Sequence, residues 1–274
     1  MKDENMNKRL RNECAFSLIC SAEDAANMIE DGMAVGISGF TNAGYPKAVP
    51  HALAEQAKAG RKVKIDLYSG ASVGPEVDTE LTEAGVIGKR IPYQTNSVLR
   101  KSINAGDVGY IDMHLGRSPE FVAAGHVRKP DIALVEALAI TENGDLVPTT
   151  SVGNTPAYVA EADAVIVEIA MAKPLELEGM ADVYMCEKPP LRQPIPLTHP
   201  GQRIGTPYIK CGWDKIKAIV LSEKTDLTRP LAAISEDSKK IGENIIKFFE
   251  NEVAEGRLGK SLLPMRCPGC VRGI

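Results

Sequence analysis

The chain has 274 residues, of which 44% are hydrophobic and 25% charged, and its formal net charge at pH 7 is −4. The negative charge and an aromatic share of 5% argue against nucleic acid or an anionic membrane as the main partner. No apolar run approaches the roughly 18 residues that span a bilayer, and no apolar core of a signal peptide follows the charged start. We therefore expect a cytoplasmic protein with one large domain or two small ones.

A strand, a glycine-bearing loop and a helix are predicted early in the chain. Ala34–Ile37 is short, apolar and partly β-branched, as in a buried strand. Gly39 and Gly44 bracket a polar turn, and Pro46 suits the start of a helix that continues over 51–59. Backbone N–H groups at such a loop are expected to face outward, unpaired, where they suit an anion or oxyanion. A plain tight turn is the alternative, and the spacing fits neither a P-loop nor a dinucleotide fingerprint.

Strands and helices alternate along the rest of the chain. Strands are predicted at 62–69, 110–113, 132–140, 164–169 and 216–222, and helices at 22–29, 76–84, 98–104, 119–125, 155–162 and 237–253. The alternation predicts an α/β fold, an open and mostly parallel sheet flanked by helices. Ligands of such sheets bind beyond the carboxyl ends of the strands, so we expect the loops 39–46, 70–74 and 149–154 to share that edge.

Three further patterns have weaker implications. Asn143–Gly144 predicts a hairpin turn, and the proline-rich segment 174–207 predicts an extended excursion that covers a site or a partner. The six cysteines are scattered and predict no disulfide framework. Cys267 and Cys270 have C-x-x-C spacing without a second ligand pair, which favours chance over zinc. We expect no metal and no permanently bound cofactor.

Several motifs, in order, resemble one family. They are Gly39-Phe-Thr-Asn-Ala-Gly-Tyr-Pro-Lys-Ala-Val-Pro50, Ser69–Gly74, Pro92–Thr95, Pro174–Met180 and Arg203–Tyr208. Together they resemble the acetyl-CoA hydrolase/transferase family, which includes succinate:acetate and related class I CoA-transferases. The resemblance covers residues 18 to 265.

The resemblance implies a two-domain enzyme in which each half is an open α/β layer. Such enzymes transfer CoA between an acyl-CoA, here acetyl-CoA or succinyl-CoA, and a small carboxylate. A glutamate attacks the thioester and becomes a glutamyl-CoA thioester, while backbone N–H groups stabilise the oxyanion. Coenzyme A is therefore a substrate. In the family this glutamate lies in the second half, after a glycine-rich loop, so we expect no catalytic residue within these 274 residues.

The resemblance also suggests how the chain is divided. We expect an N-terminal tail at 1–14, a CoA-transferase N-terminal α/β domain at 15–230, a linking helix with the start of a truncated second domain at 231–265, and a divergent tail at 266–274. Three functions stay open: a CoA-transferase, an inactive half or one subunit of a two-chain enzyme, and, less favoured, a sugar-phosphate isomerase. An uncovered face would also favour a homo-oligomer.

Five residues are candidates for an acyl and carboxylate pocket: Gly39, Gly44, Ser72, Thr95 and Arg229. The two hydroxyl side chains lie on strand-end loops, and the guanidinium can pair a substrate carboxylate bidentately. The competing interpretations are that the two hydroxyls cap turns and that Arg229 is a solvated surface charge. We expect the last three of these residues to lie near one another at the strand-end edge.

Two glutamates interrupt apolar strands. Glu136 and Glu168 are tempting as nucleophiles, but each is surrounded in sequence by residues of a buried strand. A paired or site-lining carboxylate is the favoured interpretation of both.

Overall fold

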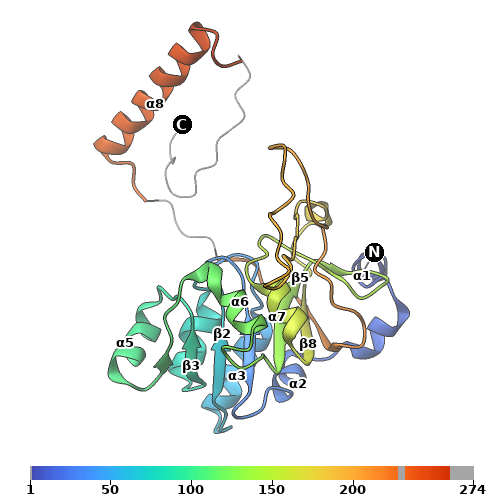
Figure 1. Ribbon diagram of the computed structural model, residues 1–274. Helices are drawn as coiled ribbons and strands as arrows, with labels where there is room; N and C mark the ends of the chain where they lie inside the picture. Colours follow the sequence, from blue (N-terminus) through green and yellow to red (C-terminus); the bar gives the residue numbers. More distant parts are fainter. Residues whose placement is uncertain (1, 228–231, 260–274) are drawn as a thin grey trace. The chain divides into compact units, whose positions relative to one another are not determined.

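The computed structural model describes residues 2–227 and 232–259 (Figure 1). It divides into two compact units, Met1–Thr228 and Arg229–Ile274. The first unit carries the sheet, and the described part of the second carries one helix.

Among the described residues, seven strands form one sheet in the order β4-β3-β2-β1-β5-β8-β9, and every neighbouring pair is parallel. The strands are β1 Ala34–Ile37, β2 Ile65–Tyr68, β3 Ile87–Ile91, β4 Gly109–Tyr110, β5 Ile132–Ala137, β8 Ala164–Ala170 and β9 Ile216–Ser222. The predicted open, parallel α/β sheet is therefore confirmed. The order runs outward in both directions from β1, so the topological switch point lies between β1 and β5.

Helices cover both faces of this sheet. Those of the first unit are α1 Lys2–Arg9, α2 Ala22–Asn27, α3 Ala48–Lys58, α4 Leu81–Glu83, α5 Ser97–Ala105, α6 Ser118–Ala123 and α7 Thr155–Glu161. Helix α2 packs on α3, whereas α6 packs on α7, and α7 contacts β1 and β5 (Figure 1).

The alternation of side chains along the strands produces two cores. Val35 and Ile37 of β1 pack with Leu53 of α3, while Val135 of β5 packs with Tyr158 of α7 in a separate cluster. Successive residues of a strand point to opposite faces, so odd and even positions feed different cores. Each fully buried large aliphatic side chain contributes about 1.5–3 kcal/mol.

The strand β3 is an element that the sequence analysis misses. Its centre reads Gly-Lys-Arg, which breaks any apolar pattern. Arg90 is nevertheless buried, because its guanidinium pairs with Asp78 at 3.3 Å and donates to the carbonyl of Ile91 at 2.9 Å. A buried cation with a partner from another element cannot be predicted from local periodicity.

The predicted strand over 132–140 is divided in two. β5 ends at Ala137, and β6 Ala139–Ile140 pairs antiparallel with β7 Leu146–Val147. The hairpin turn between them is confirmed, and Gly144 has a φ of 85°.

Residues 2–10 pack onto the first unit, although the sequence analysis separates 1–14 as a tail. Leu10 is buried, and so is the guanidinium of Arg9. That guanidinium donates to the carbonyls of Leu138 at 3.0 Å, Ala170 at 3.2 Å and Lys173 at 2.6 Å. It therefore joins the chain start to the ends of β5 and β8.

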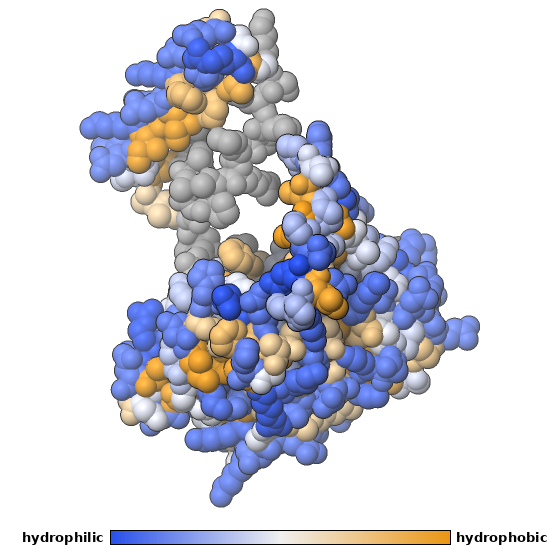
Figure 2. Space-filling view, in the orientation of Figure 1, coloured by the Kyte–Doolittle hydropathy of each residue, from blue (hydrophilic) through white to orange (hydrophobic). Residues whose placement is uncertain are grey.

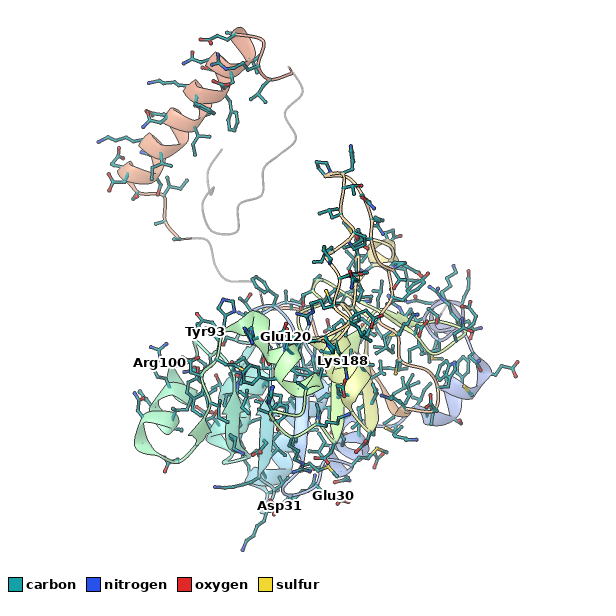
Figure 3. All side chains as sticks on the ribbon, in the orientation of Figure 1. Glu30, Asp31, Tyr93, Arg100, Glu120 and Lys188 are labelled. Carbon is teal, nitrogen blue, oxygen red and sulfur yellow. The ribbon has the colours of Figure 1, made fainter. Side chains whose placement is uncertain are left out.

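The segment 174–207 is an extended excursion, as predicted. Two ion pairs attach it to the helices of one face: Lys188 lies 2.6 Å from Glu161 of α7, and Arg192 pairs with Glu120 of α6 (Figure 3). Figure 2 shows apolar side chains along it. Met185 is one of its exposed apolar residues.

In the second unit, α8 Glu236–Ala254 agrees with the predicted helix at 237–253. Ser235 caps it by accepting from the N–H of Ser238 at 3.1 Å. Its apolar residues form a stripe that is not fully buried at any position (Figure 2). None of the helices within the described ranges combines the length and hydropathy needed to cross a bilayer.

Candidate functional site

Three loops meet at the carboxyl edge of the sheet. The N–H of Asn154 donates to Ser38 Oγ at 2.8 Å, and Ser151 Oγ donates to the carbonyl of Ala43 at 2.9 Å. Gly74 lies directly against the ring of Tyr45. The prediction that 39–46, 70–74 and 149–154 share one edge is confirmed. In Figure 3, Tyr93 lies at this edge, and Glu30 and Asp31, which precede β1, lie at the opposite one.

The loop that follows β1 is closed by its own backbone. The N–H of Phe40 donates to the carbonyl of Ala43 at 2.9 Å, and the reverse bond measures 3.1 Å. Gly44 has a φ of 67°, and a Cβ there would lie 2.7 Å from the backbone nitrogen of Ser151. Glycine is therefore required at 44, both for its backbone conformation and for the close approach of the 149–154 loop.

The helix α3 begins on an internal anion. The carboxylate of Glu168 accepts from the N–H groups of Lys47 at 2.8 Å, Ala48 at 2.8 and 2.9 Å and Val49 at 3.1 Å. Burial raises the pKa of Glu168, and the three N–H donors oppose that effect. The expectation of unpaired, outward-facing N–H groups is wrong for these three amides, because the chain supplies its own carboxylate.

Beside that contact lies a closed ring of four charges, here called the charge ring: Lys47, Glu136 and Lys173, which are buried, and Asp226, which is partly buried. Lys47 Nζ lies 2.5 Å from Glu136 and 2.9 Å from Asp226, and Lys173 Nζ lies 2.6 Å and 2.7 Å from the same two carboxylates. Glu136 and Glu168 are direct neighbours in the β5–β8 register, so the same strand face delivers both.

The ring also shifts the pKa of two of its members, Lys47 and Asp226. Burial alone would lower the pKa of Lys47, but Glu136 and Asp226 outweigh it and raise that pKa. Burial would likewise raise the pKa of Asp226, and the hydrogen bonds from Lys173, Lys47 and Thr150 bring it below its ordinary value. Lys47 and Asp226 are therefore both charged at neutral pH.

Ser72 and Thr95, which the sequence places in one pocket, are neighbours. Ser72 Oγ donates to Asp78 Oδ2 at 2.7 Å and accepts from the N–H of Thr95 at 3.3 Å. Asp78 in turn pairs with Arg90. Both hydrogen-bonding capacities of Ser72 are thus used within the chain, while Thr95 is exposed. Arg229, the remaining member, lies outside the described residues.

Sequence reasoning assigns no role at this edge to five residues: Lys47, Asp78, Arg90, Lys173 and Asp226. Each of them pairs with a side chain from another element or loop, which local sequence does not reveal. Within residues 2–227 and 232–259, no group of three or more metal-ligating side chains has the geometry to hold an ion. Cys267 and Cys270 lie outside those ranges.

The paired carboxylates limit the chemistry of this edge. Glu136 is held by two lysines, and Glu168 is buried against three amides. Neither has a free, solvent-accessible oxygen with which to attack a thioester. Among the hydroxyl side chains of this edge, that of Thr95 is exposed.

Comparison with solved structures gives the fold. RipA from Yersinia pestis has a TM-score of 0.58 at 15% identity, with 89% of this chain and 49% of that chain covered. Glutaconate coenzyme A-transferase from Acidaminococcus fermentans has a TM-score of 0.52 at 15% identity, with coverages of 87% and 89%. The first unit therefore has a CoA-transferase-like fold.

Sequence comparison gives the family. The chain belongs to the acetyl-CoA hydrolase/transferase family, whose N-terminal domain matches residues 4–241. It is 50% identical over 260 residues to the succinyl-CoA:acetate CoA-transferase of Clostridium kluyveri, covering 94% of this chain and 48% of that protein. It is 35% identical over 271 residues to an acetyl-CoA hydrolase of Candida glabrata, with coverages of 95% and 51%. The chain thus spans about half the length of these relatives.

Proposed function

We propose that this chain supplies the acyl- and carboxylate-binding half of a CoA-transferase. The enzyme would move CoA between acetyl-CoA or succinyl-CoA and a small carboxylate through a glutamyl-CoA thioester. The similarity to a succinyl-CoA:acetate CoA-transferase supports this choice of substrates. Coenzyme A is then a substrate, no cofactor stays bound, and a homo-oligomer is compatible with the assignment.

One observation carries the proposal: the loops after β1 and β2 meet beside the switch point, next to the Ser72–Thr95 contact. In the proposed pocket, Gly39 and Gly44 shape the loop beside the acyl group, since both are buried and packed against the chain itself. Thr95 and Ser72 line the carboxylate subsite, and Arg229 pairs with the carboxylate through two parallel N–H bonds.

The nucleophile must then come from another segment or another chain. Formation of a glutamyl thioester needs a free carboxylate against the thioester carbon. Glu136 and Glu168 are both engaged, so we infer that these 274 residues alone do not catalyse transfer. The chain is then either an inactive half of the enzyme or one subunit of a two-chain enzyme.

The carboxylate subsite is tested by titrating succinate into the chain and following amide chemical shifts. We expect saturable shifts in 70–74 and 92–96, and an affinity at least about tenfold weaker in Arg229→Ala, since a charge-assisted pair is lost. Arg128→Ala is the matched control, because Arg128 is exposed and bonds to Gly32 and Asp131 at the amino edge. Equal affinity in Arg229→Ala, or shifts confined to other loops, would contradict the assignment.

A further inference from the structure

We propose that Asp78 is a positioning residue, one that acts through the hydroxyl of Ser72 on the backbone of Thr95. Its consequence for binding rests on the proposed function, which places Ser72 and Thr95 in the carboxylate subsite. The contacts themselves lie wholly within the described part of the first unit, so they can be tested without a ligand.

Asp78, in the π-helical turn η2 Glu76–Glu80, divides its two carboxylate oxygens between different parts of the fold. Oδ1 faces Arg90 of β3 and accepts from Nε at 3.4 Å and from Nη2 at 3.3 Å. Oδ2 faces the loop after β2 and accepts from Ser72 Oγ at 2.7 Å and from the N–H of Val73 at 3.2 Å. Both side chains of the ion pair are 0% exposed. The carboxylate therefore ties the 70–74 loop to β3.

The bond to Asp78 sets the direction of the Ser72 hydroxyl. An ionised carboxylate only accepts, so the O–H of Ser72 must point at Oδ2. The lone pairs of the same oxygen then remain for the N–H of Thr95, which donates to it at 3.3 Å. Without an acceptor at position 78 the hydroxyl could turn and donate elsewhere, and the N–H of Thr95 would lose a defined acceptor.

Thr95 is held by its backbone on two sides while its hydroxyl is left to a ligand. Its N–H donates to Ser72, and its carbonyl accepts from Arg100 of α5 at 3.3 Å. The residue is exposed, and within residues 2–227 and 232–259 nothing bonds to its hydroxyl. Such a hydroxyl can donate to a carboxylate. Because its backbone is already fixed, less conformational entropy is lost when a ligand binds, and the affinity rises without a further contact.

Positioning explains the buried ion pair better than stability does. Replacing such a pair by apolar side chains of similar volume is often neutral or stabilising. In the β2–β3 register Arg90 lies beside Leu67, a member of an apolar cluster, so an apolar residue would suit its position. An apolar residue in place of Asp78 could not hold an acceptor against Ser72.

Two double variants separate the hydrogen bond from the ion pair. The acceptor-free variant Asp78→Leu/Arg90→Met removes both charges and the acceptor for Ser72. The acceptor-bearing variant Asp78→Asn/Arg90→Met removes both charges but keeps an acceptor oxygen. Neither leaves a buried charge unpaired. Amide exchange is followed by NMR on the full chain. The N–H of Thr95 should exchange about tenfold faster in the acceptor-free variant and within about threefold of the unmodified rate in the acceptor-bearing one.

Ser72→Ala gives an independent measurement, because it removes the acceptor of the Thr95 N–H and leaves the Asp78–Arg90 pair in place. It should also raise the exchange rate of this N–H about tenfold, with the amides of β2 and β3 unchanged.

The matched control is Asp66→Asn/Lys89→Met, which removes another ion pair, 2.7 Å long, between β2 and β3. It should leave the exchange of Thr95 unchanged. Equal Thr95 rates in the acceptor-free and acceptor-bearing variants, or an unchanged rate in Ser72→Ala, would overturn the proposal. Faster exchange at all amides of the acceptor-free variant alone would show that Asp78 supports the core instead, and would overturn it too.

Succinate titration separates this inference from the proposed function. If the unmodified chain binds succinate, the acceptor-free variant should bind it about tenfold more weakly and the acceptor-bearing variant with nearly unmodified affinity. Equal affinities of the two variants would overturn the positioning role and leave the proposed function standing. If the unmodified chain does not bind succinate, the proposed function fails, and the exchange rates alone decide whether Asp78 holds Thr95.

Discussion

The two glutamates inside apolar strands have different partners, although they lie side by side in the sheet. Glu136 neutralises lysines, whereas Glu168 replaces the missing acceptors at the start of α3. The first turn of a helix has N–H groups without intrahelical partners and the positive end of the helix dipole, so a buried carboxylate there is stabilised twice. One side chain of β8 therefore determines how α3 docks on the sheet.

The variant Glu168→Gln tests this role. An amide has a single acceptor oxygen and turns an NH₂ group toward backbone donors, so we expect a loss of roughly 1.5–3 kcal/mol in the free energy of unfolding. Urea denaturation of the variant and of Glu176→Gln, an exposed glutamate, measures the difference. The control should stay within about 0.5 kcal/mol of the unmodified chain. Equal stabilities of the two variants would refute the capping role.

The lowered pKa of Asp226 predicts a dependence of stability on pH. A carboxyl group whose folded-state pKa lies below its ordinary value of 3.8 contributes fully to stability above that value. The contribution declines below 3.8 and is lost as the pH falls through the lowered folded-state pKa. The difference in melting temperature between the unmodified chain and Asp226→Asn should be largest at neutral pH and should narrow below about pH 4. Thermal melts from pH 7 down to about pH 2 measure it, and a constant difference over that range would count against the ring as an ionised unit.

The residues of the site differ in how far the sequence predicts them. Ser72 lies in the motif Ser69–Gly74 and Thr95 in the motif Pro92–Thr95. The order of these two motifs is enough to predict that the two residues lie together, and the N–H of Thr95 does donate to Ser72 Oγ. The charge ring is not predictable in this way, because residues 47, 136, 173 and 226 have no common local pattern. Only the parallel register of β5, β8 and β9 brings their segments to one edge.

At the level of elements, α7 packs on β1, and Gly36 is the residue of β1 that approaches α7 most closely. A Cβ on Gly36 would lie 2.8 to 3.0 Å from ring atoms of Tyr158 in α7. The aromatic ring is buried and donates through its hydroxyl to the carbonyl of Ser69 at 2.5 Å, so it cannot easily move away. The glycine is thus what allows α7 to pack directly over the switch point.

We expect Gly36→Ala to lower the free energy of unfolding by about 1–3 kcal/mol through overpacking. Gly88→Ala is the matched control, since Gly88 is also a strand glycine and its added Cβ would meet nothing nearer than 3.4 Å. Denaturant titration of both variants gives the comparison. If Gly36→Ala is as stable as Gly88→Ala, the tight packing of α7 on β1 is refuted.

Most elements follow from local signals, and the exceptions have physical reasons. Ser21 caps α2 by accepting from the N–H of Asp24 at 3.0 Å, and Gly106, with a φ of 85°, ends α5. A serine before a helix and a glycine after it are local signals of helix ends. β3 escapes prediction because it contains the buried Arg90. α1 escapes it because what holds it is Arg9 on distant carbonyls rather than an apolar stripe.

At the level of the whole molecule, the alternation of strands and helices is enough to predict the sheet, and the strand order then locates the switch point. The first unit has a CoA-transferase-like fold, and the chain spans about half the length of the relatives it matches. Family membership is shown by the match over residues 4–241, whereas the choice of acyl group and the completeness of the site are proposals.

The most direct test of this account is an assay of CoA transfer by the 274-residue chain. Succinyl-CoA and acetate are supplied, any enzyme–CoA thioester is trapped with hydroxylamine, and the modified residue is mapped by mass spectrometry. The full-length succinyl-CoA:acetate CoA-transferase of Clostridium kluyveri serves as the positive control. Because Glu136 and Glu168 are both engaged, we predict no turnover and no trapped glutamate in the chain alone. Turnover with an adduct on either glutamate would contradict the account.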